Sequence, residues 1–308
     1  MVGLMAAGFE ERIQSLIDSI TFAADTPSKL ENLHQLKQEL LGVEDDTTVS
    51  FSDFLRSLLK LLSDCFSPVR KCVTEVIGEI GLRHLEILPE ITPALLTVVD
   101  DDTPAVARQA ITSGTNIFCC TMEKIALQGL NASKLDDSLE SAWEWMLKLK
   151  EKICSIAFES GSDGKRLLAL KFVAAIILIY TPDPNGGTEL PSHLISDGKE
   201  AGFTISCVRR GHPLLKIGDL SIEASQSLRL LLDQLRLPIV KSLSTSMVVV
   251  LINCLSAIAV KRPSFYGRIL PVLLGLDPSN SVIKGLHAYG VQNALKECIS
   301  LLLEVCTP

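Results

Sequence analysis

The residues of this chain that could act as acids, bases, nucleophiles or metal ligands are scattered along it. The five histidines show no H-E-x-x-H or other metal-ligand spacing; they are His34, His84, His193, His212 and His287. The nine cysteines include no C-x-x-C pair, which is typical of reduced core cysteines in an intracellular protein. No G-x-S-x-G sequence occurs. We therefore expect no catalytic centre, no metal and no cofactor.

One glycine-containing turn comes nearest to a phosphate-binding loop. Residues Gly161–Arg166 place Lys165 after a glycine, but the position six residues before this lysine is Glu159 rather than glycine. Arg166 also stands where that motif requires Ser or Thr. Acidic runs such as Asp100–Asp102 precede predicted helices, where carboxylates cap the N-terminus and suit the helix dipole. We interpret all of these residues as structural.

Three stretches of the chain share one pattern. Residues 64–81, 100–118 and 161–182 each open with a turn containing Asp, Pro or Gly, continue with Arg or Lys, and then become apolar. The apolar part is long enough for a helix of about four turns. Val69 aligns with Val106, which gives a period of roughly 40 residues, in the range of HEAT and armadillo units.

A charged residue in the third stretch stands out. From Leu167 to Tyr180 this helix is apolar except for Lys171, so most of its surface must be buried. The alignment of the three stretches places Lys171 in one column with Glu75 and Thr112. Because this column is polar in every copy, we expect it to face solvent on one side of a stack of helices.

The whole chain is predicted to be an all-α, HEAT/armadillo-like solenoid of about six helix pairs, forming a single domain over residues 1–308. Further helices are expected at 9–22, 27–42, 54–62, 87–99, 138–158, 219–235, 242–261, 264–276 and 280–305. Residues 181–218 are rich in Gly and Pro and predict a long irregular loop inserted between repeats. Within that loop, Thr204–Val208 is expected to form one short strand.

Composition narrows the range of partners. The net charge of −7 disfavours a nucleic-acid binder that uses its whole surface, although a local basic patch stays open. The longest apolar runs, Phe172–Tyr180 and Met247–Val260, are shorter than the ~20 residues of a membrane span. We therefore expect no membrane partner.

Basic residues gather at the starts of the repeated helices, namely Arg70, Lys71, Arg108, Lys165 and Arg166. One interpretation is an ion-pair ladder in which each arginine binds an aspartate of a neighbouring turn. The other is that part of the row faces a partner. Lys171 is the best candidate for such a contact, because no carboxylate lies three or four residues away and Ala174 and Ala175 leave room for a partner helix. The alternative for Lys171 is an exposed lysine whose stem covers apolar surface.

Several short motifs resemble the N-terminal HEAT domain of symplekin, the scaffold of mRNA 3′-end cleavage and polyadenylation. They are Asp163–Arg166, Ala169–Val173, Thr181–Pro182, Arg209–Pro213 and Lys261–Phe265. The similarity runs from about Phe9 to beyond Pro263, and the order of the motifs around the long loop makes it specific. The many cysteines and few aromatic residues fit a plant member. Family members are much longer, so we expect the chain to be part of a larger protein.

The resemblance implies a non-catalytic scaffold in the nucleus, together with other cleavage and polyadenylation factors. In that family the concave face holds a cysteine-based phosphatase of the RNA polymerase II C-terminal domain, and the contact can stimulate it. The implied partner-binding residues are Lys171, Arg166, Lys165, Arg108, Thr112 and Asn116, with loop contacts from Arg209 and Arg210. Two alternatives stay open: a cytoplasmic transport or signalling adaptor of the same fold, and RNA binding through Lys165, Arg166, Lys171, Arg209 and Arg210.

Overall fold

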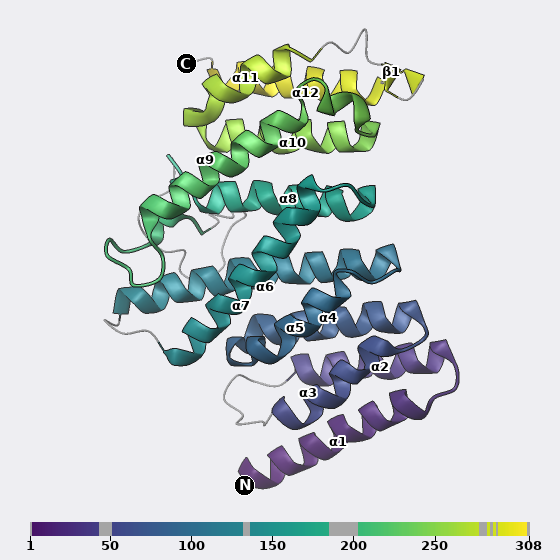
Figure 1. Cartoon of the computed structure of the whole chain (residues 1–308). Coiled ribbons are helices and arrows are strands. Elements are labelled where there is room, and N and C mark those ends of the chain that lie inside the picture. Colours follow the sequence, from purple (N-terminus) through teal and green to yellow (C-terminus); the bar gives the residue numbers. More distant parts are fainter. Residues whose placement is uncertain are drawn as a thin grey trace. The chain divides into compact units, whose positions relative to one another are not determined.

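The computed structural model in Figure 1 describes most of the chain as helices. The residues it describes are 2–42, 51–131, 136–184, 203–276, 282–283, 286–287 and 289–306. They divide into two compact units, the first comprising Met1–Met122 with Asp136–Lys152 and the second comprising Glu123–Leu135 with Ile153–Pro308. The expected irregular loop is described only at its two ends, because residues 185–202 lie outside the described part.

The first unit is a series of packed helix pairs. Its helices are α1 (Val2–Phe22), α2 (Thr26–Leu41), α3 (Phe51–Lys60), α4 (Ser67–Arg83), α5 (Leu88–Val98) and the first parts of α6 (Pro104–Asn131) and α7 (Asp137–Phe158). Short 3-10 turns follow α3 at Leu61–Ser63 and precede α5 at Leu85–Ile87. Helix α2 packs against α1 and α4, and α4 in turn packs against α3 and α5. Neighbouring pairs therefore stack through α2 and α4.

The second unit repeats this arrangement. Besides the ends of α6 and α7, it holds α8 (Asp163–Ile179), α9 (Ile217–Gln234), α10 (Thr245–Lys261), α11 (Tyr266–Leu274) and α12 (Tyr289–Cys306), with 3-10 turns at Ile205–Cys207, Ile239–Ser242 and Pro263–Phe265. Helices α8, α10 and α12 lie side by side in one layer (Figure 1). Helix α9 packs on α8 and helix α11 packs on α10. Only one face of α10 is left uncovered by these neighbours.

The predicted all-α helical-repeat fold is confirmed, and the three repeated stretches are helices α4, α6 and α8. Residues that the sequence alignment places together share the same burial. The apolar columns Val73, Ala110, Ala169 and Ile80, Ile117, Ile176 are all buried. The polar column behaves in the opposite way, because Thr112 and Lys171 are exposed and the Glu75 side chain is 41% exposed. The repeat pattern therefore marks which side of each helix faces the core.

Two local predictions were wrong. The expected strand Thr204–Val208 is a 3-10 turn at Ile205–Cys207, closed by a hydrogen bond from Cys207 N to Thr204 O. Its apolar residues Ile205, Cys207 and Val208 are buried, as those of a short core strand would be, but they lie in a turn. The helix expected from residue 280 begins only at Tyr289, after a two-residue antiparallel pair of β1 (Val282–Ile283) and β2 (Leu286–His287). The β-branched Val282 and Ile283 favour that extended geometry.

Helices α4 and α6 approach each other closely at a glycine. A Cβ atom on Gly78 would lie 2.4 Å from Ser113 Oγ, and one on Gly81 would lie 3.1 Å from the Ile117 side chain. The Ser113 hydroxyl donates a hydrogen bond to Thr74 O across the same contact, at 3.4 Å. Small residues are therefore required where these two helices cross.

We expect Gly78→Ala to destabilise the protein by about 2 kcal/mol, because the added methyl group must displace Ser113 and overpack the crossing. The matched control is Gly267→Ala in α11, where no atom lies within 4 Å of the added Cβ. That substitution should be neutral or stabilising by up to about 1 kcal/mol through helix propensity. Urea unfolding midpoints measure both, and equal effects of the two substitutions would contradict the close crossing.

Candidate functional site

The described side chains show no arrangement suited to catalysis. Among the described residues, no group of three His, Cys, Asp or Glu side chains could hold a metal ion. Burial raises the pKa of the Cys254 thiol to about 11 and also raises the pKa values of Cys298 and Cys72. Thiols with raised pKa values are poor nucleophiles at neutral pH. These cysteines are therefore suited to core packing.

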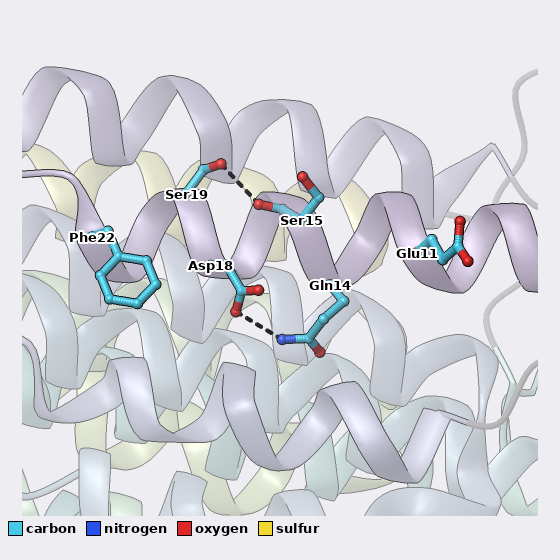
Figure 2. A pocket seen from close by; sticks show the side chains of 6 residues that line it. All are labelled: Glu11, Gln14, Ser15, Asp18, Ser19 and Phe22. Carbon is cyan, nitrogen blue, oxygen red and sulfur yellow. Dashed lines mark hydrogen bonds between the residues drawn. The ribbon is translucent and has the colours of Figure 1, made fainter.

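A shallow depression runs along the outer face of α1. Figure 2 shows its lining: Glu11, Gln14, Ser15, Asp18, Ser19 and Phe22. Within the helix, Gln14 Nε2 donates to Asp18 Oδ1 at 2.9 Å and Ser19 Oγ donates to Ser15 O at 2.8 Å. The depression is open and is lined mostly by polar residues, as a solvated helix face is. We assign no ligand to it.

The basic row at the helix starts is partly an ion-pair ladder. Arg70 of α4 binds Asp101, in the turn before α6, through two hydrogen bonds of 2.8 and 2.9 Å. The same guanidinium donates to Asp64 O at 2.8 Å. The ladder interpretation is therefore correct for Arg70, whose charge is committed inside the first unit.

Lys165 and Arg166, at the start of α8, are half buried. Arg166 Nε is buried and has no hydrogen-bond partner, so part of this side chain is held within the packing of α8. Lys165 makes interactions of its own within the protein. Both residues are therefore less available for a partner than the sequence suggests.

Arg108, Thr112 and Asn116 are all exposed on α6, as expected from their spacing of four residues. Thr112 Oγ1 donates to Arg108 O at 3.0 Å. These residues belong to the first unit, whereas Lys171 and Arg166 belong to the second. That the two groups lie side by side stays a prediction.

Lys171 projects from the middle of α8 and is exposed. Its charge acts to lower the pKa of Cys254, against the stronger effect of burial, so Lys171 lies on the side of α8 that borders α10. Among the described residues, Lys171 makes no ion pair. The sequence prediction of an unpaired lysine on an exposed stripe therefore agrees with the structure.

Helix α10 carries an exposed stripe beside Lys171. Asn253, Ala257 and Lys261 recur every four residues and are all exposed, so they share one face of α10. Together with Lys171 and the half-buried Ala175 of α8, they form what we call the α8–α10 face. Sequence reasoning missed the α10 half, although the period of four residues was visible in the printed sequence.

The α8–α10 face differs in charge from the corresponding surface of the first unit. There Lys37 of α2 lies 2.7 Å from both Glu75 and Glu79 of α4. Burial acts to lower the Lys37 pKa, but the two glutamates outweigh it and raise the pKa overall. Apart from Asp163 at its first residue, α8 contains no carboxylate, and α10 contains none. Among the described residues, the α8–α10 face is therefore positively charged and forms no internal ion pair.

A buried arginine fixes α8 against α10. Arg262 is only 3% exposed and donates to Thr181 Oγ1 at 2.9 Å and to Leu178 O at 2.6 Å. It thereby caps the carbonyl end of α8, where helices leave acceptors unpaired. Burial lowers the Arg262 pKa and Asp183, 3.7 Å away, opposes that shift. Sequence reasoning quoted Arg262 only as part of a motif and missed this role.

A second buried side chain anchors the turn that carries Arg209 and Arg210. His212 Nδ1 accepts hydrogen bonds from Leu214 N and Leu215 N at 3.2 and 3.0 Å, so the ring proton must sit on Nε2. Nε2 then donates to Ile125 O at 3.1 Å. Gly211 adopts a φ of 81°, which favours glycine. The anchored turn leaves Arg209 and Arg210 exposed.

Comparison with known protein families assigns the chain to one of them. Residues 103–304 match the Symplekin/PTA1 N-terminal family. The chain belongs to that family. Its members are helical scaffolds of mRNA 3′-end processing and are generally nuclear and non-catalytic. Membership of the family assigns this chain a role as a symplekin-like scaffold of mRNA 3′-end processing.

Two solved structures are similar over most of their length, and both are crystal structures of engineered proteins. The first has a TM-score of 0.42 at 13% identity and covers 95% of this chain and 98% of its own. The second has a TM-score of 0.26 at 12% identity and covers 96% of this chain and 82% of its own. At these scores neither likeness adds to the assignment.

Among the described residues, no single helix has both the length and the apolar content to cross a membrane. Helix α10 with Pro263–Leu274 would reach that length and composition only as a pair bent by 120° at the break between them.

We expect Arg262→Gln to destabilise the symplekin-like chain by about 3 kcal/mol, because the buried acceptors at the end of α8 lose their donor. The control is Arg236→Gln, which removes an exposed arginine paired with Asp233 at 2.9 Å and should cost less than about 1 kcal/mol. Thermal and urea unfolding compare the two. A small effect at Arg262 would show that this residue does not hold α8 and α10 together.

The Arg70–Asp101 pair predicts an acid-dependent loss of stability. The hydrogen bonds from Arg70 lower the Asp101 pKa below its unfolded value of about 3.9. The pair's contribution is therefore complete above about pH 5 and is lost as the pH falls through the folded-state pKa. Asp101→Asn should cost about 2 kcal/mol at pH 7, and the difference from wild type should shrink below about pH 4.

Urea unfolding between pH 2.5 and pH 7 measures this difference. Asp233→Asn, at an exposed ion pair, serves as the control and should show little effect at either pH. A difference for Asp101→Asn that stays constant down to pH 2.5 would contradict the prediction.

Proposed function

We propose that this chain binds a cysteine-based phosphatase of the RNA polymerase II C-terminal domain through the α8–α10 face, as a scaffold of pre-mRNA cleavage and polyadenylation. The observation that carries the proposal is Lys171, an exposed lysine on a buried helix whose charge has no counterion on its own face. Membership of the symplekin/PTA1 family supplies the processing role. The phosphatase is the partner that the sequence resemblance implies.

The architecture suits such a contact. Helix α8 is fixed by apolar packing and by Arg262, so little backbone freedom is lost when a partner binds Lys171. A specific interface buries roughly 800 Å² on each partner and concentrates its affinity in a few anchors. If the scaffold binds the active conformation of the phosphatase more tightly than its inactive conformations, binding increases the fraction of active enzyme and so stimulates it.

RNA is the second candidate partner, favoured by one observation. Arg209 and Arg210 are exposed on a turn that His212 anchors, and arginines held in this way can contact phosphates. Against it stands the net charge of −7, which opposes binding outside a local patch.

We expect Lys171→Ala to weaken binding of the purified phosphatase by about tenfold, the loss typical of one interface anchor. Lys60→Ala, which removes an exposed lysine at the end of α3, is the matched control and should leave affinity unchanged. Titration calorimetry measures the affinity, and hydrolysis of a C-terminal-domain phosphopeptide measures stimulation. The proposal is wrong if the wild-type chain binds no phosphatase, or if both variants bind equally well.

The same preparations decide whether RNA is the partner. Fluorescence anisotropy with a uridine-rich oligonucleotide should show no binding at physiological salt and no change on Lys171→Ala. Tight binding that falls steeply with salt and is lost when Arg209 and Arg210 are replaced by alanine would favour RNA instead.

A further inference from the structure

Building on the proposed function, we propose that the α8–α10 face receives an acidic helix of the bound partner. Lys171 and Lys261 hold this helix at two points, and Asn253 and Ala257 lie under the segment between them. Helix α10 is thus part of the contact, and the partner must present carboxylates to it.

The two lysines of the α8–α10 face can be paired by carboxylates of a binding partner. Lys261 is exposed at the end of α10, and among the described residues it makes no ion pair. Asp183, the acidic residue that follows α8, faces the buried Arg262 at 3.7 Å. Asp163 is eight residues before Lys171 on α8, which is about 12 Å along the helix axis. Neither carboxylate neutralises the two lysines.

In the first unit, a lysine between two neighbouring helices is paired with carboxylates of the same chain. Lys37 is bound by two glutamates that lie one turn apart on α4, at 2.7 Å each. Helix α10 occupies the equivalent place beside Lys171, but presents Asn253 and Ala257 instead of acidic residues. A partner helix with carboxylates would restore on the α8–α10 face the pairing that the first unit makes within itself.

The spacing of the lysines selects a helix. The bond from Arg262 Nη2 to Leu178 O sets α8 and α10 in parallel register, so Lys171 lies level with about residue 255. Lys261 is then about six residues further along, or roughly 9 Å, on a helix axis 8–10 Å away. The backbone positions of the two lysines are therefore roughly 13 Å apart, close to the 10.5–12 Å that separates helix positions i and i+7 or i+8.

The surface between the two lysines carries small side chains. Ala175 and Ala257 have small side chains, so a partner backbone can approach without displacing a long residue, and Asn253 can both donate and accept a hydrogen bond. An amphipathic helix lying on another helical surface is a recurrent mode of recognition. The small residues and the flanking charges thus fit one occupant, an acidic helix with carboxylates about two turns apart.

Two variants of the chain bound to the phosphatase test this inference. Lys261→Glu should weaken binding by about tenfold and Ala257→Tyr by a similar factor, through charge repulsion and through bulk respectively. Lys60→Glu is the matched charge control and should leave affinity unchanged. Binding of the wild type should also weaken as salt rises from 50 to 300 mM. Unchanged thermal melting of each variant shows that it is folded, because all three positions are exposed.

A photo-crosslinker placed at residue 257 identifies the occupant. The inference predicts a cross-link to a helical phosphatase peptide that carries acidic residues seven or eight positions apart. A cross-link to a segment without acidic residues, or to RNA, overturns it. If the wild type binds the phosphatase and Lys171→Ala weakens it while Lys261→Glu and Ala257→Tyr do not, this inference fails and the proposed function stands. If the wild type binds no phosphatase, both fail.

Discussion

The buried guanidinium of Arg262 is the interaction on which the second unit depends. Removing an arginine from water is costly, and burial lowers its pKa. That cost is offset because the side chain donates to carbonyl and hydroxyl acceptors at the end of α8, where a helix leaves carbonyl groups without intrahelical donors. One residue at the end of α10 thus fixes where α8 ends and how the two helices align. The geometry of the α8–α10 face follows from that alignment.

Basic residues on the helices differ between the two units in whether a carboxylate binds them. Lys37 and Arg70 are bound by carboxylates of neighbouring elements, so their charges contribute to the structure of the first unit. Lys171 and Lys261 stand on helices of the second unit, and among the described residues neither of them is paired with a carboxylate. A charge that is positioned yet unpaired costs little in water and gains its value only when a partner supplies the counterion. This contrast within one chain supports the α8–α10 face as the proposed binding surface.

The parts of the fold that depend on local periodicity could be predicted from the sequence. The buried columns of α4, α6 and α8, and the exposure of Lys171, follow from the spacing of apolar residues along each helix. Arg262 and His212 could not be predicted, because their partners lie 81 and 87 residues away in the chain and no local pattern signals a buried cap. The strand expected at Thr204–Val208 failed because a short apolar run suits a buried turn as well as a strand. Whether residues 1–308 form one domain stays a prediction.

The buried histidine and cysteine side chains of the second unit serve the packing of its helices. Catalysis needs a titratable group that is both accessible and unsatisfied. His212 has both ring nitrogens bound to the backbone, and Cys254 lies in the core with a raised pKa. These groups are used to hold the helices in place. Among the described residues of the second unit, the α8–α10 face presents two exposed lysines, and such a surface is suited to selecting a partner by charge and shape.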